Sequence, residues 1–71
     1  MLVCQKSECI VLRTKDVSDG GLLFNVFGKT LPETFAIDKF VRTRADSEAE
    51  ATAKIGKIVR LSDFEMAVQF V

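Results

Sequence analysis

Apolar residues fall in short runs separated by polar and glycine-containing segments, a pattern that predicts β-strands. We expect strands at residues 8–15, 22–27, 34–43 and 64–71. The segment 22–27 is largely apolar on both faces, which indicates a strand that is central or buried on both sides. Residues 64–71 alternate cleanly between apolar and polar, which is typical of a strand with one buried face.

The same alternation predicts which side chains point inward. In residues 22–27 one face carries Leu22, Phe24 and Val26. In residues 34–43 Lys39 interrupts a face that carries Phe35, Ile37 and Val41. In residues 64–71 the inward face carries Phe64, Met66, Val68 and Phe70. These side chains are the expected core.

Residues 47–61 fit two patterns. Ser47 and Glu50 match a helix capping box, and the helical stripe that follows contains Ala51, Ile55, Ile58 and Val59. Against this, apolar residues occupy nearly every odd position from 49 to 61, which is close to the period of a strand. Gly56 would also cost a helix about 1 kcal/mol relative to alanine. The pattern favours a strand at 52–61, paired with 64–71 as a hairpin, and leaves a helix at 48–60 as the alternative.

Asp19-Gly20-Gly21 is a strong turn signal after the first strand, since glycine adopts positive φ without steric cost. Five or six short strands joined by turns predict an all-β fold, a small closed antiparallel barrel. The length of 71 residues allows a single domain spanning residues 1–71. A helix at 48–60 would instead give an α+β fold, an antiparallel sheet with one helix.

Composition narrows the function. The chain has no His, no recognisable nucleophile–base pair and no persuasive carboxylate pair, so we expect no enzymatic activity, no metal site and no cofactor. Ten basic residues balance ten acidic ones, whereas a duplex-DNA binder normally carries a basic excess. Arg42 and Arg44 form a small basic spot among acidic residues, which indicates a solvated loop.

The cysteine pattern and the hydropathy bear on localisation. Cys4 and Cys9 are too few for a four-ligand zinc site, and their spacing is not Cys-x-x-Cys. Cys9 opens an apolar run, so we expect a small buried hydrophobe and reduced thiols. The sequence shows neither a signal-peptide pattern nor an apolar stretch long enough to span a membrane. A cytoplasmic protein is therefore expected.

Three blocks of the chain resemble the PilZ domain family. Residues 16–21, DVSDGG, match that family's D-x-S-x-x-G motif, within the block LRTKDVSDGGLLF. LPETFAIDKF is similar to the family's LP-x-G segment, and ATAKIGKIVRLSDFEMAVQFV is similar to its closing hairpin. The resemblance covers residues 9–71 and favours the strand at 51–61. It implies a six-stranded barrel from a bacterial protein that binds cyclic di-GMP or acts as an adaptor, for example in pilus, motility or signalling machinery.

The resemblance also implies roles for the motif residues. Asp16 would accept hydrogen bonds from a guanine edge, and Ser18 would offer its hydroxyl to the base. Gly20 and Gly21 complete the motif, and Gly21 would let the backbone approach the ligand closely. The alternative is purely local, because Asp and Ser side chains commonly satisfy backbone groups in turns.

One feature of nucleotide-binding members is missing here. The upstream R-x-x-x-R motif is absent, and the only basic substitutes are Lys6 and Arg13. Two lost charge-assisted contacts would cost about 3–6 kcal/mol, which moves a micromolar site towards millimolar. We therefore expect a non-enzymatic adaptor that acts through protein contacts, with weak or no cyclic di-GMP binding.

Two alternatives remain at this level. One is a cyclic di-GMP receptor with an atypical site. The other, tied to a helix at 48–60, is a small inhibitor or nucleic-acid-binding module. The absence of residues beyond Val71 suggests a minimal version or a fragment, and the apolar surface of 22–27 favours a protein partner or a homo-oligomer.

Overall fold

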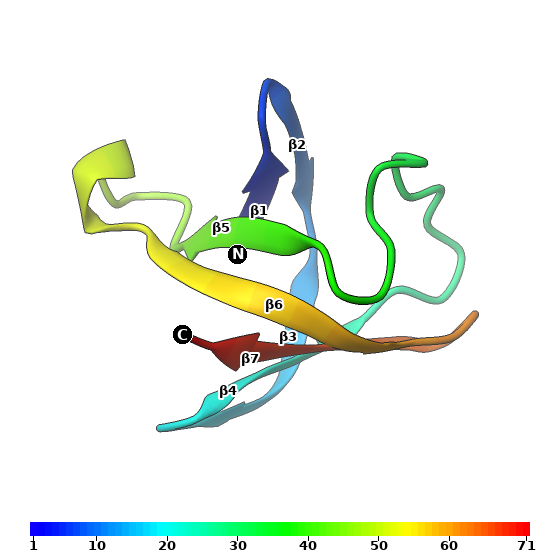
Figure 1. The fold of residues 1–71 in the computed structure, drawn as a ribbon. Helices are drawn as coiled ribbons and strands as arrows, with labels where there is room; N and C mark the ends of the chain where they lie inside the picture. Colours follow the sequence, from blue (N-terminus) through cyan, green and yellow to red (C-terminus); the bar gives the residue numbers. More distant parts are fainter.

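The computed structural model describes the backbone of residues 1–71 and the side chains of residues 1–49 and 51–71. Seven strands and one short 3-10 helix form in this part of the chain (Figure 1). In chain order they are β1 (Leu2–Gln5), β2 (Glu8–Val11), β3 (Arg13–Ser18), β4 (Gly21–Asn25), β5 (Phe40–Arg44), η1 (Glu50–Thr52), β6 (Lys54–Leu61) and β7 (Glu65–Phe70).

All seven strands belong to one antiparallel sheet in the order β2-β1-β5-β6-β7-β4-β3. The two edge strands, β2 and β3, are consecutive in the chain and are separated only by Leu12. Leu12 is buried, and its backbone N–H donates a hydrogen bond of 2.9 Å to the carbonyl of Met1. The sheet must therefore curl until its edges approach each other, which confirms the predicted all-β, barrel-like fold.

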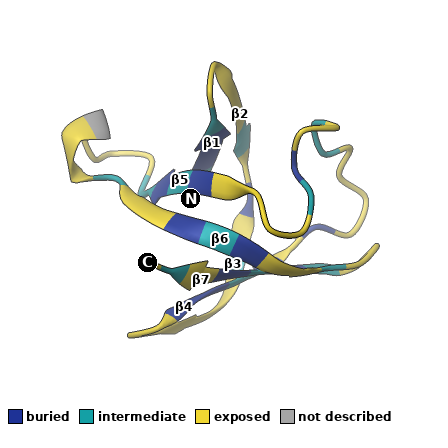
Figure 2. Cartoon of the chain, viewed as in Figure 1, coloured by how far each residue is buried: buried dark blue, intermediate teal, exposed yellow. Residues whose placement is uncertain are grey.

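The core lies inside this curl: β1, β4, β5, β6 and β7 each contain buried residues (Figure 2), and the buried apolar side chains form one cluster. Leu22, Phe24 and Val26 are buried as predicted, and so are Phe35, Val41, Met66 and Val68. The remaining buried apolar residues of the core cluster are Val3, Leu12 and Ile58. Alternation within each strand thus decides most of the interior, because successive side chains point to opposite faces.

Three expectations about burial are wrong. Phe64 is exposed, because it lies in the turn that precedes β7. Phe27 is also exposed, so residues 22–27 are not buried on both sides; the other alternative is confirmed, because β4 is an interior strand between β7 and β3. Ile37 is exposed because residues 34–39 form turns instead of a strand, and β5 begins only at Phe40. Successive backbone hydrogen bonds, from Phe35 to Pro32 and from Lys39 to Ala36, hold these turns.

The ambiguous segment is a strand, and the helix at 48–60 is wrong apart from the three residues of η1. The face was mispredicted, however, because Gly56 and Ile58 point inward while Ile55 and Val59 are exposed. Ile58 pairs with Val68 and Arg60 with Ala67, so Val59 is an extra residue in a β-bulge. The bulge reverses the alternation and turns Leu61 back towards the core.

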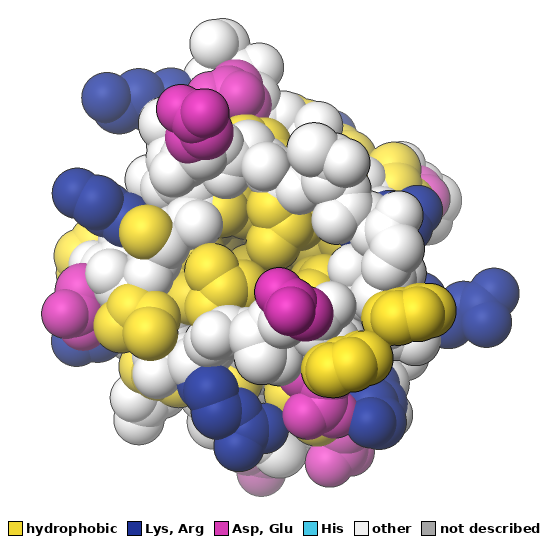
Figure 3. All heavy atoms as spheres, turned by 90° about the vertical axis from the view of Figure 1, so that its right-hand side faces the viewer, with side chains coloured by type: hydrophobic (Ala, Val, Ile, Leu, Met, Phe, Trp, Pro, Cys, Tyr) yellow, Lys and Arg dark blue, Asp and Glu magenta, His cyan; other side chains and the backbone are white. Residues whose placement is uncertain are grey.

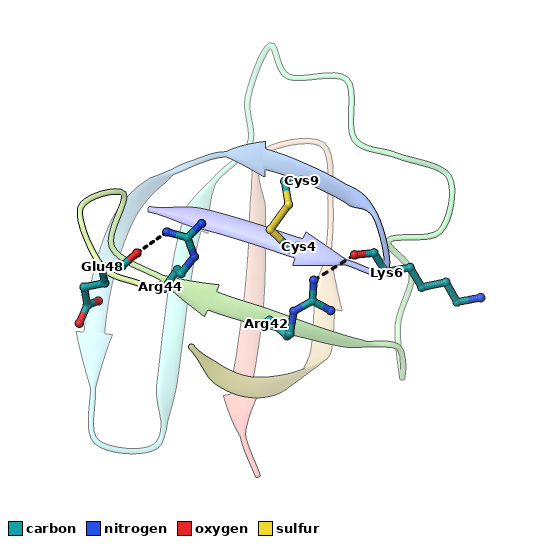
Figure 4. Close-up of a disulfide and its surroundings, with 6 residues drawn as sticks. All are labelled: Cys4, Lys6, Cys9, Arg42, Arg44 and Glu48. Atoms are coloured by element: carbon teal, nitrogen blue, oxygen red, sulfur yellow. Dashed lines mark hydrogen bonds between the residues drawn. A yellow bond between two sulfur atoms is a disulfide. The ribbon is translucent and has the colours of Figure 1, made fainter. Parts of the chain in front are cut away.

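The amino-terminal third also departs from expectation. The strand expected at 8–15 is divided at Leu12, where the chain passes from one sheet edge to the other. Strand β1 was not predicted, because four residues are too few to show a period. Arg42 and Arg44 lie on β5 and not in a solvated loop. Their guanidinium groups donate to the carbonyls of Lys6 and Glu48 (Figure 4).

The expectations for the cysteines are wrong as well. Cys4 and Cys9 lie directly opposite each other in the β1–β2 hairpin, with Cα atoms 4.1 Å apart, and form a disulfide (Figure 4). Cys4 is buried, but Cys9 is exposed and is not a core residue. Among the described residues, no helix has the length and apolar character needed to cross a bilayer.

Candidate functional site

The D-x-S-x-x-G residues line a groove on the convex face of the sheet, which Asp16, Ser18, Gly20 and Gly21 share with residues of β6 and β7. The pairing register shows how this groove is built. Asp16 pairs with Leu23, Leu23 with Ala67, and Ala67 with Arg60, so these four residues form one row across four strands. A second row on the same face contains Ser18, Gly21, Gln69 and Lys57.

Small side chains make the floor of this motif groove. Gly21 is buried, and a Cβ placed there would lie 2.1 Å from the carbonyl oxygen of Val68. Gly21 is therefore required by the close approach of β4 to β7. Its φ is not in the left-handed region, and neither is that of Gly20, so the predicted use of positive φ in this turn is wrong.

The motif side chains make the local contacts that a turn requires. The Oδ1 atom of Asp16 accepts a hydrogen bond of 2.9 Å from the backbone N–H of Val17. The hydroxyl of Ser18 donates to the carbonyl of Gly21 over 3.5 Å, which is long. Both side chains remain at the groove, where Asp16 is exposed. The local alternative thus has contacts to support it, and these contacts leave Asp16 accessible to a ligand.

Arg60 forms the opposite wall of the motif groove, and sequence reasoning missed it. Three interstrand spacings separate it from Asp16, which is about 14 Å across the sheet. Its guanidinium lies 3.7 Å from Glu65, whose carboxylate also accepts a hydrogen bond of 2.5 Å from Lys15. The hydrogen bond from Lys15, its positive charge and the charge of Arg60 lower the pKa of Glu65 below the ordinary value of 4.5. In the sequence, the feature that could have identified Arg60 is its position near the end of the expected strand 52–61.

The two basic residues proposed from the sequence lie elsewhere. Lys6 is at the tip of the β1–β2 hairpin and lines a different groove, together with Phe40 and Arg42. Arg13 is at the far end of β3, where it pairs with Asn25. The structure therefore brings Asp16, Ser18, Gly20 and Gly21 together and separates Lys6 and Arg13 from them.

An aromatic pair marks a second surface. The rings of Phe27 and Phe64 stack with centroids 5.4 Å apart and planes 8° from parallel, although their side chains are 68% and 60% exposed. The backbone N–H of Val26 donates to the carbonyl of Phe64, which ties the two turns together. Figure 3 shows hydrophobic side chains around a hollow on the side of residues 26–39 and the β6–β7 turn. Val26, Phe27, Leu31, Leu61 and Phe64 line a groove there.

Comparison with protein-family models, curated proteins and solved structures finds no match to this chain. The fold therefore defines the class at the level of architecture, a small all-β domain built from one curled antiparallel sheet. This architecture does not define a function, because one fold can host many activities, and the surface features of the domain are therefore decisive.

Proposed function

We propose that this chain is a PilZ-like, non-enzymatic adaptor domain that acts through protein contacts. The observation that supports it best is the stacked pair of Phe27 and Phe64, which the fold holds in an exposed position. Large aromatic side chains are favoured at the centres of protein interfaces, where their burial contributes most to affinity. A charged pair, Lys15 and Glu65, borders the rings and offers the polar rim that such interfaces carry.

The aromatic pair would act by burial against a partner. Phe27 lies just after β4 and Phe64 just before β7, two strands that pair directly. The stacking contact restrains both rings, which lowers the side-chain entropy that binding has to remove. This proposal places the domain in the cytoplasm of a bacterium. Cytosolic thiols are kept reduced, so the disulfide between Cys4 and Cys9 argues against this compartment, and the adaptor role rests on the exposed rings alone.

The adaptor proposal is tested by quantitative affinity purification with the wild-type chain and a Phe27→Ser/Phe64→Ser variant. Val17→Ser is the matched control, since Val17 is an exposed apolar side chain outside the aromatic pair. We expect a small set of proteins that the double variant loses and the control keeps, with binding of the purified partner confirmed by calorimetry. Identical protein sets for all three chains would contradict the proposal.

A second candidate function is cyclic di-GMP binding in the motif groove, and the position of Arg60 favours it. In that arrangement Asp16 accepts hydrogen bonds from a guanine edge while Arg60 holds a phosphate through its planar fork of donors. Weak binding was expected because the upstream arginines are missing, but Arg60 supplies a cation in the same groove as Asp16. The competing contact between Arg60 and Glu65 weakens this function, because it occupies part of the guanidinium.

Isothermal calorimetry with cyclic di-GMP separates the two functions. The adaptor proposal expects no dissociation constant below about ten micromolar, because the upstream arginines are missing. A tighter constant that is lost in both Arg60→Ala and Asp16→Asn would establish a receptor. Arg13→Ala serves as the control, since Arg13 lies outside the motif groove.

A further inference from the structure

A third groove lies where the β1–β2 turn meets the segment leading into β5. It is lined chiefly by Gln5, Lys6, Lys39, Phe40, Arg42 and Ile55. None of these residues lines the motif groove or the groove beside Phe27 and Phe64. We call it the hairpin groove. Its chemistry differs from theirs in two respects, a buried polar atom without a hydrogen-bond partner and an excess of cations, and it also carries an exposed apolar pair of its own.

The unmet polar atom is the side-chain oxygen of Gln5. This Oε1 atom is buried and has no hydrogen-bonding partner among the described residues. Buried polar atoms nearly always have a hydrogen-bond partner, because a buried atom without one loses its hydrogen bonds to water and gains nothing in return. Because this atom is out of contact with solvent, a ligand N–H group satisfies it once the Gln5 side chain turns outward into the groove. An extended peptide offers both N–H and C=O groups. It therefore also fits if the side-chain amide of Gln5 is rotated by 180° and presents its NH2 group instead of its oxygen.

The charges of the hairpin groove favour an anionic ligand. Lys6, Lys39 and Arg42 contribute three cations, and Asp38 is the one carboxylate on the described lining. The carboxylate of Asp38 already lies 4.0 Å from the ammonium of Lys57. Lys6 and Lys39 have no ion-pair partner within the described part of the chain, so their charges are available to a ligand.

Two apolar side chains complete the hairpin groove. Phe40 on β5 and Ile55 on β6 are 53% and 51% exposed, and both strands turn these residues to the convex face. Ile55 pairs with Arg42, two residues along β5 from Phe40, so the two apolar side chains are diagonal neighbours. Diagonal neighbours on adjacent strands lie about 7–8 Å apart, which leaves room for one apolar side chain of a ligand to contact both.

The β1–β2 turn is held in place from two sides. The disulfide between Cys4 and Cys9 closes the hairpin below Lys6 (Figure 4). The Nη2 atom of Arg42 donates a hydrogen bond of 2.9 Å to the carbonyl of Lys6, whose φ of 54° lies in the left-handed region. The backbone that carries Gln5 and Lys6 is therefore fixed relative to β5, as a preformed site requires.

We propose that the hairpin groove binds an extended, acidic segment of a partner protein. A backbone N–H of that segment meets Gln5, carboxylates meet Lys6 and Lys39, and one apolar side chain lies over Phe40 and Ile55. This inference deepens the adaptor proposal and rests on it, because it names the chemistry of a partner segment. The surface involved is separate from the stacked aromatic pair.

Fluorescence anisotropy and amide chemical shifts test the hairpin groove directly. The probe is a labelled synthetic peptide of alternating Glu and Leu, compared with a matched peptide of alternating Lys and Leu. We expect the acidic peptide to bind more tightly and to shift the side-chain amide of Gln5 and the backbone amide of Phe40. Lys6→Glu/Lys39→Glu should weaken binding at least about tenfold, because both charges then repel the ligand.

The matched control is Arg13→Glu/Lys29→Glu, which changes the net charge equally but lies outside the hairpin groove. Equal loss of affinity in both double variants, or tighter binding of the Lys peptide, would overturn the inference. So would identical shifts produced by inorganic phosphate alone, which would define a small-anion site. Phe27→Ser/Phe64→Ser should still bind the acidic peptide. Loss of partner capture in that variant with peptide binding intact separates the two proposals.

Discussion

The two hairpins at the edges of the sheet carry the two candidate binding grooves, yet they are held by different forces. In the β3–β4 hairpin, the backbone of Gly21 lies so close to β7 that no side chain fits there. In the β1–β2 hairpin, a disulfide and the guanidinium of Arg42 hold a turn whose Lys6 has a left-handed backbone. One hairpin is thus defined by steric contact within the sheet. The other depends on a covalent bond that responds to its redox environment.

The largest expected effect breaks the first hairpin. Gly21→Ala should destabilise the chain by about 3 kcal/mol, because the new Cβ meets the Val68 carbonyl and a β-strand must move. Gly20→Ala is the control, since nothing lies within 4 Å of a Cβ there and its φ is not left-handed. Its free energy of unfolding should change by less than about 0.5 kcal/mol. Urea denaturation measures both, and equal effects at the two glycines would contradict the close approach of β4 to β7.

The next effect breaks the second hairpin alone. The disulfide joins residues five positions apart, and closing so short a loop stabilises the folded chain by about 2 kcal/mol in the chain-entropy model. Wild type should lose this amount in reductant, whereas Cys4→Ala/Cys9→Ala should unfold identically with and without it. Hydrogen exchange should accelerate more at β1 and β2 than at β3 and β4, where only global unfolding is affected. Equal acceleration in both hairpins would mean that they do not open independently.

A smaller effect concerns the left-handed backbone of Lys6, a feature that Gly20 and Gly21 in the β3–β4 hairpin do not share. Lys6→Gly should stabilise the chain by about 0.5 kcal/mol, since glycine relieves the left-handed strain at some entropic cost. Lys6→Ala removes the same side chain but keeps the strain, and it should not stabilise. Thermal unfolding of the two variants gives the comparison. A stabilising Lys6→Ala would point to charge, not conformation, as the cause.

The smallest effect concerns pH and the wall of the motif groove. The pKa of Glu65 is lowered in the folded chain, mainly by the hydrogen bond from Lys15, so its contribution is present above the ordinary value of 4.5. That contribution is lost as the pH falls through the lowered pKa. Glu65→Gln should therefore flatten the acid side of the stability curve, and Glu33→Gln should leave it unchanged. The effect stays small because exposed ion pairs are screened by water and salt.

The sequence predicted the elements that depend on local alternation. The inward faces of β4 and β7 could be assigned from residues such as Phe24 and Met66, since a strand reverses its side chains at every step. The turn at Asp19-Gly20 and the motif residues Asp16 and Ser18 were placed correctly beside each other. The same reasoning failed at β6, where Ile55 is exposed and Gly56 faces inward, and where the bulge at Val59 then reverses the alternation without any local signal.

Long-range pairing settled the rest. Arg60 lies in the same row of the sheet as Asp16, and Cys4 pairs with Cys9, because of strand register that residue types along one segment do not specify. Leu12 is buried because the two edges of a curled sheet approach there, although it lies inside what reads as one continuous strand. Local periodicity thus assigns the faces of individual strands. Which side chains share a groove follows from the order in which strands pair, and that order is set by burial of the whole core.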